Sequence, residues 1–583
     1  MTSRFCLAIG RETDWYVTTW QERLAPLFPV VSMQEGAALF CENATDAIAL
    51  PSVDGWIVGK LFRAADSRPV SHIETHQQLA VASTGGRSLL AAYFGSYVAI
   101  WRNGPDRPWC VMRDPSATQP VLFHSGSGLT LIASDLEALE AFGHIRTSID
   151  WTGIAHNLCY PQVPTARTGI EGVTELLPGQ RMRLDADAPT TEQIWQPWAF
   201  RNAAQGAAAS RNRIKELESV VDRVVAAWAF GVEQIGLELS GGLDSSILSA
   251  ALDGASAHWT GFTFATRAAD GDERRYARMV TDTFAAPLIE AVVGDNVVIA
   301  LDTLARRTER PGGTGFLAGL DRTLQALGDA VGADAFLSGA GGDNVFCSIG
   351  STAPIIDAWQ VGGLALARRA FADVATTSGS THWQVGRSLA LRWIRDSLHT
   401  RNWPPNHRFL NRDVRPAPDR HPWLALPAGT PPGLRAHIAA VLRIHMVLTA
   451  HDRFCKRRYV FPLLSQPVLE ACLAIPSWQW LAGGRDRAVA RAAFADRLPP
   501  AVVARTKKGR VESLMVRAYD RARPELTATL RDGLLHGAGL LDMPTIVDCL
   551  REPATGGPAD YARILALVDA ELLARTVLTK TRS

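Results

Sequence analysis

Hydrophobic and polar positions follow two different rhythms along the chain, and the change falls near residue 200. Before it, short apolar or alternating runs are separated by turn residues, as in AAYFGSYVAIW (91–101), WCVMRD (109–114) and PVLFHSGSGLTLIAS (120–134). The last run contains a glycine-serine-glycine turn at 126–128, which is typical of a hairpin. The pattern predicts a β-rich first domain over residues 1–200.

From residue 201 to 583, stretches with helical spacing alternate with short strands. IGLELS, HWTGFTFAT and ADAFLSG are expected strands, whereas RIKELESVVDRVVAAWAF, ILSAALDGA and DERRYARMVTDTFAA are expected helices. Such alternation predicts a doubly wound parallel sheet. The small, polar segment 200–212 is the expected linker. Eight prolines between 404 and 432 predict a long surface loop.

The run SGGLDSS follows the expected strand IGLELS directly, where ligands bind in a doubly wound sheet. Gly241 and Gly242 allow the backbone to approach an anion, and amides at the start of the next helix, together with serine hydroxyls, suit phosphate. Asp244 would repel phosphate unless a divalent cation lay between them, so we predict a magnesium ligand. A plain turn, in which Asp244 or Ser245 caps the helix, is the alternative.

A second carboxylate follows another expected strand. FLSGAGGDNVF (336–346) repeats the order of strand, glycine turn and aspartate, and it places Asp343 where Asp244 stands in the first run. Parallel strands end at the same edge of a sheet, so we predict that Asp343 is the second magnesium ligand.

Three of these segments resemble known enzymes. SGGLDSS is similar to the pyrophosphate-binding loop of the N-type ATP pyrophosphatases, FLSGAGGDNVF to the SGEGxDExF element of asparagine synthetases, and RTKKGR (505–510) to the stretch that carries the active-site lysine in asparagine and β-lactam synthetases. The resemblance implies ATP and Mg2+ as cofactors. The nucleotide-binding residues it implies are Leu239, Ser240, Gly241, Gly242, Asp244, Ser245, Ser246 and Gly339.

The resemblance also implies a role for the lysine. Negative charge builds on the carbonyl oxygen and the leaving phosphate when an amine attacks an acyl-adenylate, and a fixed cation stabilises it. The spacing in the family favours Lys507, with Lys508 as the alternative. Asp272 and Glu273, at the start of a charged helix, are interpreted as part of a solvated face.

The first half resembles the glutamine-hydrolysing domain of the same family, in VMRDPSATQPVLFH (111–124), LTLIASDLEAL (129–139) and ARTGIEGVTELLPGQRMRL (166–184). The implied fold class is α/β: an Ntn-hydrolase-like, β-rich α+β domain followed by a doubly wound ATP pyrophosphatase domain. Such glutaminases use a cysteine at position 2, but here Thr2 stands there, the nearby cysteine is Cys6, and the RGPD motif is missing. The resemblance therefore implies an inactive glutaminase domain.

Without glutamine hydrolysis the nitrogen must come with the substrate. The position three residues before Asp343 is a tyrosine in small-molecule synthetases and a glutamate in asparagine synthetases, but here it is Ala340, which cannot act as a base. The chain most resembles the lasso-peptide isopeptide cyclases, which implies a precursor peptide as substrate and a leader-removing protease as partner. A β-lactam-type synthetase, an ammonia-dependent asparagine synthetase and a non-catalytic scaffold are the alternatives.

Composition and charge limit the classes of partner and the cellular location to be expected. The formal net charge is +2, from 60 basic and 58 acidic residues, which gives no general reason to expect nucleic acid or an anionic membrane. Eight scattered cysteines without a CxxC pair predict reduced thiols and no zinc site. No apolar run of transmembrane length and no secretory signal is visible, so we predict a cytoplasmic protein without membrane insertion. Trp403, Phe409 and Trp423 in the proline-rich segment could line a peptide pocket or pack within a surface loop.

Overall fold

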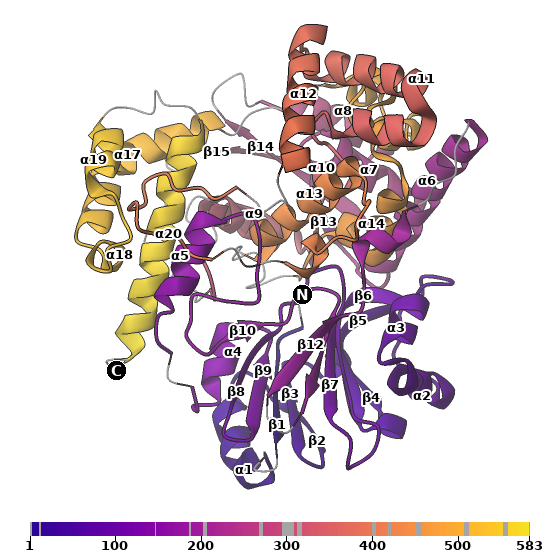
Figure 1. Cartoon of the computed structure of the whole chain (residues 1–583). Coiled ribbons are helices and arrows are strands. Elements are labelled where there is room, and N and C mark those ends of the chain that lie inside the picture. The colour runs from indigo at the N-terminus through magenta and orange to yellow at the C-terminus, as the bar shows by residue number, and fades with distance from the viewer. Residues whose placement is uncertain are drawn as a thin grey trace.

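The computed structural model (Figure 1) describes residues 3–10, 13–145, 147–185, 188–201, 207–266, 272–293, 308–311, 317–398, 404–417, 419, 421–449, 458–506, 512–551 and 558–581. The predicted α/β class is confirmed, with a β-rich part followed by a parallel-sheet part. The domain boundary at residue 200 stays a prediction. Residues 207–212, expected as linker, already belong to the long helix α6 (Ala207–Ala229).

Two six-stranded antiparallel sheets form the first part. One has the order β10-β8-β9-β1-β3-β2 and the other β12-β11-β7-β6-β5-β4. Their strands are β1 (Phe5–Gly10), β2 (Val30–Gln34), β3 (Ala37–Cys41), β4 (Ala47–Leu50), β5 (Gly55–Arg63), β6 (Tyr93–Trp101), β7 (Trp109–Arg113), β8 (Leu122–Gly126), β9 (Leu129–Ala133), β10 (Thr174–Glu175), β11 (Gln180–Leu184) and β12 (Pro189–Gln193). The runs at 91–101, 109–114 and 120–134 are therefore strands, as predicted.

The alternation of side chains along β1 shows how the two sheets pack. Phe5, Leu7 and Ile9 point into the core between the sheets, whereas Cys6 and Ala8 point to the other face. That face is covered by α1 (Thr13–Leu24) and α4 (Leu136–Ala141). The second sheet carries α2 (Thr75–Thr84) and α3 (Arg87–Ala92) on its outer side. The result is a four-layer arrangement of helix, sheet, sheet and helix.

A five-stranded parallel sheet lies at the centre of the second part, in the order β15-β14-β13-β16-β17. The strands are β13 (Ile235–Glu238), β14 (Trp259–Thr266), β15 (Leu288–Val293), β16 (Ala335–Ser338) and β17 (Arg458–Val460). Because β13 and β16 pair in parallel, with Glu238 opposite Ser338, the loops that follow them emerge at the same edge. The predicted doubly wound sheet is confirmed.

Helices surround this sheet. Those near the sheet and its loops are α6, α7 (Leu243–Gly254), α8 (Arg274–Phe284), α9 (Leu317–Val331), α10 (Gly342–Val345), α13 (Pro432–Thr449), α14 (Gln466–Ala474), α15 (Ala488–Ala493) and α16 (Pro500–Ala504). A hairpin of α11 (Ala353–Ser378) and α12 (His382–Leu398) packs against the turns of η8 (Ser477–Gly484).

The last helices form a separate bundle that reaches back to the first part. It comprises α17 (Glu512–Arg531), α18 (Leu534–Gly537), α19 (Met543–Arg551) and α20 (Pro558–Thr581), with α5 (Trp151–Cys159) beside α20 (Figure 1). Leu573 and Val577 of α20 pack with Ile170 and Val173 of the first part. Within the described residues, no helix is long and apolar enough to span a membrane.

The proline-rich segment differs from the prediction. Its described residues contain one short turn of helix, η5 (Pro422–Leu424), but Phe409 and Trp423 are buried instead of exposed. The indole of Trp423 packs against Trp195 and its Nε1 donates to the carbonyl of Pro178 at 3.1 Å. The expectation that these two rings line a substrate pocket is therefore wrong, because they fill the interior between the two parts. Trp403 lies outside the described residues.

Candidate active site

The SGGLDSS loop joins β13 to α7 at the carboxyl edge of the parallel sheet. Helix α7 begins at Leu243, and its N-cap residue, Gly242, provides no side-chain hydrogen bond. The alternative in which Asp244 or Ser245 caps the helix is therefore not what the structure shows, since both lie within its first turns. The first-turn amides and the positive end of the helix dipole suit an anion such as phosphate.

The serines of the loop stabilise its turn. The hydroxyls of Ser245 and Ser246 both donate to the carbonyl of Gly242, at 3.2 and 2.8 Å, and the amide of Gly242 donates to Ser240 Oγ at 3.3 Å. Ser246 is buried, and so is Leu239, the residue before the loop, whereas Ser240 is half-buried. Among these residues Ser240 is the most accessible to a ligand.

Two glycines bring the loop after β16 against the first turn of α7. A Cβ atom on Gly339 would lie 2.8 Å from the amide nitrogen of Ser245, and one on Gly342 would lie 2.5 Å from Cγ of Asp244. No side chain fits at either place, so glycine is required for this close approach. It is this contact that brings Asp343, the next residue, close to Asp244.

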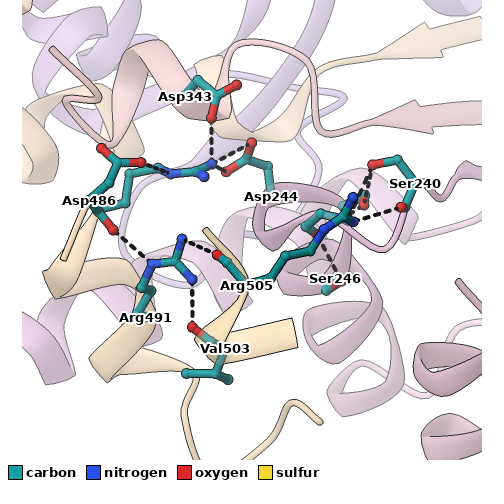
Figure 2. A network of polar contacts seen from close by, with 11 residues as sticks. Ser240, Asp244, Ser246, Asp343, Asp486, Arg491, Val503 and Arg505 are labelled. Atoms are coloured by element: carbon teal, nitrogen blue, oxygen red, sulfur yellow. Dashed lines mark hydrogen bonds and ion pairs between the residues drawn. The ribbon is translucent and has the colours of Figure 1, made fainter. Parts of the chain in front are cut away.

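Arg487 pairs with both predicted magnesium ligands, whose carboxylates are labelled in Figure 2. Its Nη1 is 2.9 Å from Oδ1 and 3.1 Å from Oδ2 of Asp244, and the same nitrogen pairs with Oδ1 of Asp343. Its Nε donates to Asp486 at 2.8 Å. Burial opposes the charge of this guanidinium, but the three carboxylates outweigh it and raise the pKa of Arg487.

The carboxylate pair fits a magnesium ion by its chemistry. Both residues offer hard oxygen ligands, and the guanidinium shows that their combined negative charge accepts a cation at this place. The described residues contain no group of three or more histidine, cysteine or acidic side chains suited to a metal. Magnesium usually takes few protein ligands and completes its shell with phosphate oxygens and water.

Two further arginines, Arg491 and Arg505, connect the segment before Lys507 to the phosphate loop through hydrogen bonds. Arg491 donates to the carbonyls of Asp486, Val503 and Arg505 at 2.7, 2.5 and 2.8 Å (Figure 2). Arg505 in turn donates to the carbonyl of Gly241 at 3.1 Å. Residue 505 is thus held beside the loop, two positions before the predicted catalytic lysine.

Arg505 has two further contacts, both with the start of α8. Its Nη2 pairs with Oε1 of Glu273, and its guanidinium lies 4.1 Å above the ring of Tyr276. The interpretation of Glu273 as part of a solvated face is therefore wrong, because this carboxylate is mostly buried and balances the charge of Arg505. Asp272 pairs with the neighbouring Arg274 on the surface, as expected of a charged face.

Other predicted residues are placed less directly. Lys507, Lys508 and Thr2 lie outside the described residues. Cys6 is fully buried near the start of β1, and burial raises the pKa of its thiol well above the ordinary value. Sequence reasoning missed Arg487 and Arg491. Two arginines four positions apart in the otherwise apolar run RAVARAAF (487–494) were the signal that could have revealed them.

Comparison with known families identifies the second part of the chain. Residues 216–575 match the family model for asparagine synthase. The chain belongs to the asparagine synthase family. Membership indicates an ATP-dependent ligase that forms an amide bond and releases AMP.

The first part matches a second model, the glutamine amidotransferase domain, over residues 63–195. This match starts after the segment that contains Thr2 and Cys6. No curated protein is significantly similar to this member of the asparagine synthase family.

Two solved structures are similar to the chain only at low identity. The first is described as the allosteric regulatory enzyme of purine biosynthesis, with 10% identity, a TM-score of 0.20, and coverage of 51% of this chain and 81% of that chain. The second is a glutamine phosphoribosylpyrophosphate amidotransferase from B. subtilis complexed with ADP and GMP, with 11% identity, a TM-score of 0.23, and coverage of 58% and 90%.

Proposed function

We propose that this enzyme is a cytoplasmic lasso-peptide macrolactam cyclase. It adenylates an Asp or Glu side chain within a precursor peptide, and the amino-terminal amine of the same peptide closes the ring. A leader-removing protease of the same pathway supplies the peptide. The observation that carries the ATP-dependent part is that Asp244 and Asp343 both pair with the guanidinium of Arg487 beside the SGGLDSS loop.

In this proposal the loop amides and Ser240 bind the polyphosphate of ATP, and Asp244 and Asp343 hold the magnesium ion that neutralises it. A carboxylate oxygen of the peptide attacks the α-phosphorus and pyrophosphate leaves. The amine nitrogen then attacks the acyl carbon, loses a proton and displaces AMP. Lys507 stabilises the charge on the carbonyl oxygen and the leaving phosphate. Holding both ends of one peptide together makes the second step effectively unimolecular.

Cys6 bears on the origin of the nitrogen. A glutaminase of this type needs an exposed amino-terminal thiol, but Cys6 is buried within β1, where it lies opposite Phe40 and Ala133. Burial raises the pKa of this thiol, so the reactive thiolate is disfavoured. An amine carried by the substrate replaces hydrolysed glutamine in this proposal.

Ala340 bears on the size of the substrate. This residue stands three positions before Asp343, in the loop where the related synthetases carry a tyrosine or glutamate. Its amide donates to Ser338 Oγ at 3.2 Å, and its methyl group offers neither a proton acceptor nor a donor. A small side chain here leaves more room at the acyl-adenylate, which favours a peptide over a small amino acid.

Mass spectrometry tests the proposal. A leader-free candidate peptide incubated with enzyme, ATP and Mg2+ should lose one water, and AMP should form in equal amount. The Asp343→Asn variant serves as control and should give neither. A parallel reaction with aspartate and ammonium tests the asparagine synthetase alternative, which the family match keeps open. Asparagine without a cyclised peptide would contradict the cyclase, and no AMP with any substrate would favour the scaffold.

A further inference from the structure

Exposed apolar side chains are concentrated on the hairpin of α11 and α12. Eleven large hydrophobic side chains are exposed in the described part of the chain, and seven of them belong to these two helices. We call this set the hairpin patch: Trp359, Val361, Leu364, Trp383, Leu391, Trp393 and Ile394. Figure 1 shows the hairpin at the top of the second part, far from the first part. Trp383 is the most accessible member, at 79% exposed.

The hairpin also has a small core formed by other side chains. Its inward faces form a small core that includes Ala370 and Val374 of α11 and Val385 of α12, closed by Leu481. Trp359 and Trp393 lie on the outside with their ring centroids 5.4 Å apart. Monomeric proteins seldom keep such a concentration of apolar surface in water, and where it occurs it commonly marks an interaction site.

The exposed charged side chains that the structure describes on the two helices are all basic. Arg368, Arg369 and Arg387 are exposed on the same two helices. The acidic residues between positions 353 and 394 are Asp357, which is buried, and Asp373, which is half-buried and accepts a hydrogen bond from the amide of Gly484 at 2.9 Å. The surface that complements this face must therefore be acidic as well as apolar.

The residue types favour a protein over other occupants. Tryptophan and arginine are enriched at the centre of protein interfaces, and the arginine fork pairs with carboxylates through two hydrogen bonds. Pairing two copies of the patch would bring Arg368, Arg369 and Arg387 of one copy near those of the other, which disfavours self-association. We propose that the hairpin patch docks a partner protein whose surface places Asp and Glu side chains around an apolar anchor.

Photo-crosslinking in the producing cell tests this docking surface. The full-length protein carries p-benzoyl-phenylalanine in place of Trp383, and a matched control carries it in place of Phe230, which is 68% exposed outside the patch. The adduct specific to position 383 is identified, and the purified partner is titrated against wild type, Trp383→Ser and Arg387→Glu. We expect at least tenfold weaker binding for both variants, and recovery of Arg387→Glu binding when an acidic residue of the partner is changed to Lys.

Three outcomes would overturn the proposal. The first is no adduct specific to position 383. The second is an adduct with another copy of the chain, together with a dimer mass in solution. The third is a lipid adduct, with sedimentation on vesicles of phosphatidylcholine and phosphatidylglycerol that Arg387→Glu abolishes. Because the changed side chains are exposed, an unchanged thermal midpoint shows that each variant is folded.

Discussion

The guanidinium of Arg487 and the carboxylate of Asp244 form a buried ion pair, with Nη1 2.9 Å from Oδ1 and 3.1 Å from Oδ2. Asp343 shares the same nitrogen. A side chain of the protein itself thus provides positive charge to these two carboxylates. A magnesium ion held by the same oxygens, as proposed above, would compete with this guanidinium, so the proposal links metal binding to the position of Arg487.

The Arg487→Met change should therefore make stability depend on Mg2+. Loss of the guanidinium removes the charge that it shares with two neighbouring carboxylates, and breaking such a buried pair should cost about 3–5 kcal/mol in the free energy of unfolding. Millimolar Mg2+ without ATP should restore much of this loss, because it binds the folded carboxylate pair. Thermal unfolding with and without MgCl2 measures the effect.

Arg497→Met is the matched control for this experiment. Arg497 also pairs with a carboxylate, Asp222 of α6, at 2.8 Å, and it donates to the carbonyl of Ala250, later in α7 than the loop residues. Its loss should lower stability in a way that Mg2+ does not repair. Equal rescue of both variants by Mg2+ would show a general ionic effect and remove Arg487 from the predicted metal site.

Changing either aspartate to asparagine should abolish AMP formation at ordinary magnesium concentrations. Asparagine keeps the size of the side chain but removes the charge that binds the cation. AMP release by Asp244→Asn and Asp343→Asn is measured at MgCl2 concentrations on the order of 1–20 mM. The Asp222→Asn variant is the control. Full turnover in either variant would exclude that residue from the metal site.

Lys507→Ala should lower turnover by about 10²-fold, by analogy with the loss of one charge-stabilising donor. Lys508→Ala removes the same charge from the same segment and should have a much smaller effect. Steady-state AMP formation at saturating ATP compares the two variants. A large loss with Lys508→Ala and a small one with Lys507→Ala would move the catalytic role by one residue.

Arg505→Lys should weaken ATP binding while leaving a positive charge in place. The guanidinium holds the carbonyl of Gly241 and pairs with Glu273, and an ammonium group cannot keep both contacts. Loss of a hydrogen bond to a charged group is worth about 1.5–3 kcal/mol, so the KM for ATP should rise about tenfold or more. Arg278 pairs with Glu290 at an exposed position, so the control variant Arg278→Lys should leave the KM for ATP unchanged. A change in kcat alone would argue against a role in positioning the loop.

The strands and the two aspartates could be predicted from sequence because local pattern determines them. Alternation marked β6, β7 and β9, and a glycine turn after an apolar run marked Asp244 and Asp343. Arg487 could not be found in this way, since it lies 243 positions from Asp244 and only the tertiary fold brings the two together. Trp423 was misjudged for a related reason, because its burial depends on Trp195 and Pro178 of the first part.

Acid should destabilise the protein through His445 of α13, which is buried beside Trp423. Burial lowers the pKa of this imidazole from 6.5 to about 3, with a smaller contribution from the charge of Arg113. Below pH 6.5 the unfolded chain takes up a proton that the folded state does not accept until about pH 3. The stabilisation from neutral His445 is therefore complete above pH 6.5 and is lost as the pH falls towards 3.

Between pH 7.5 and 5.5 this group alone should remove about 1.4 kcal/mol from the free energy of unfolding. Urea titrations at several pH values measure the slope in wild type and in His445→Gln, which should be shallower by the uptake of one proton. His144→Gln is the control, because that ring lies at the surface of the first part, against Tyr16. Identical pH slopes for wild type and His445→Gln would mean that His445 is already protonated in the folded protein, or that acid opens its surroundings before the whole chain unfolds.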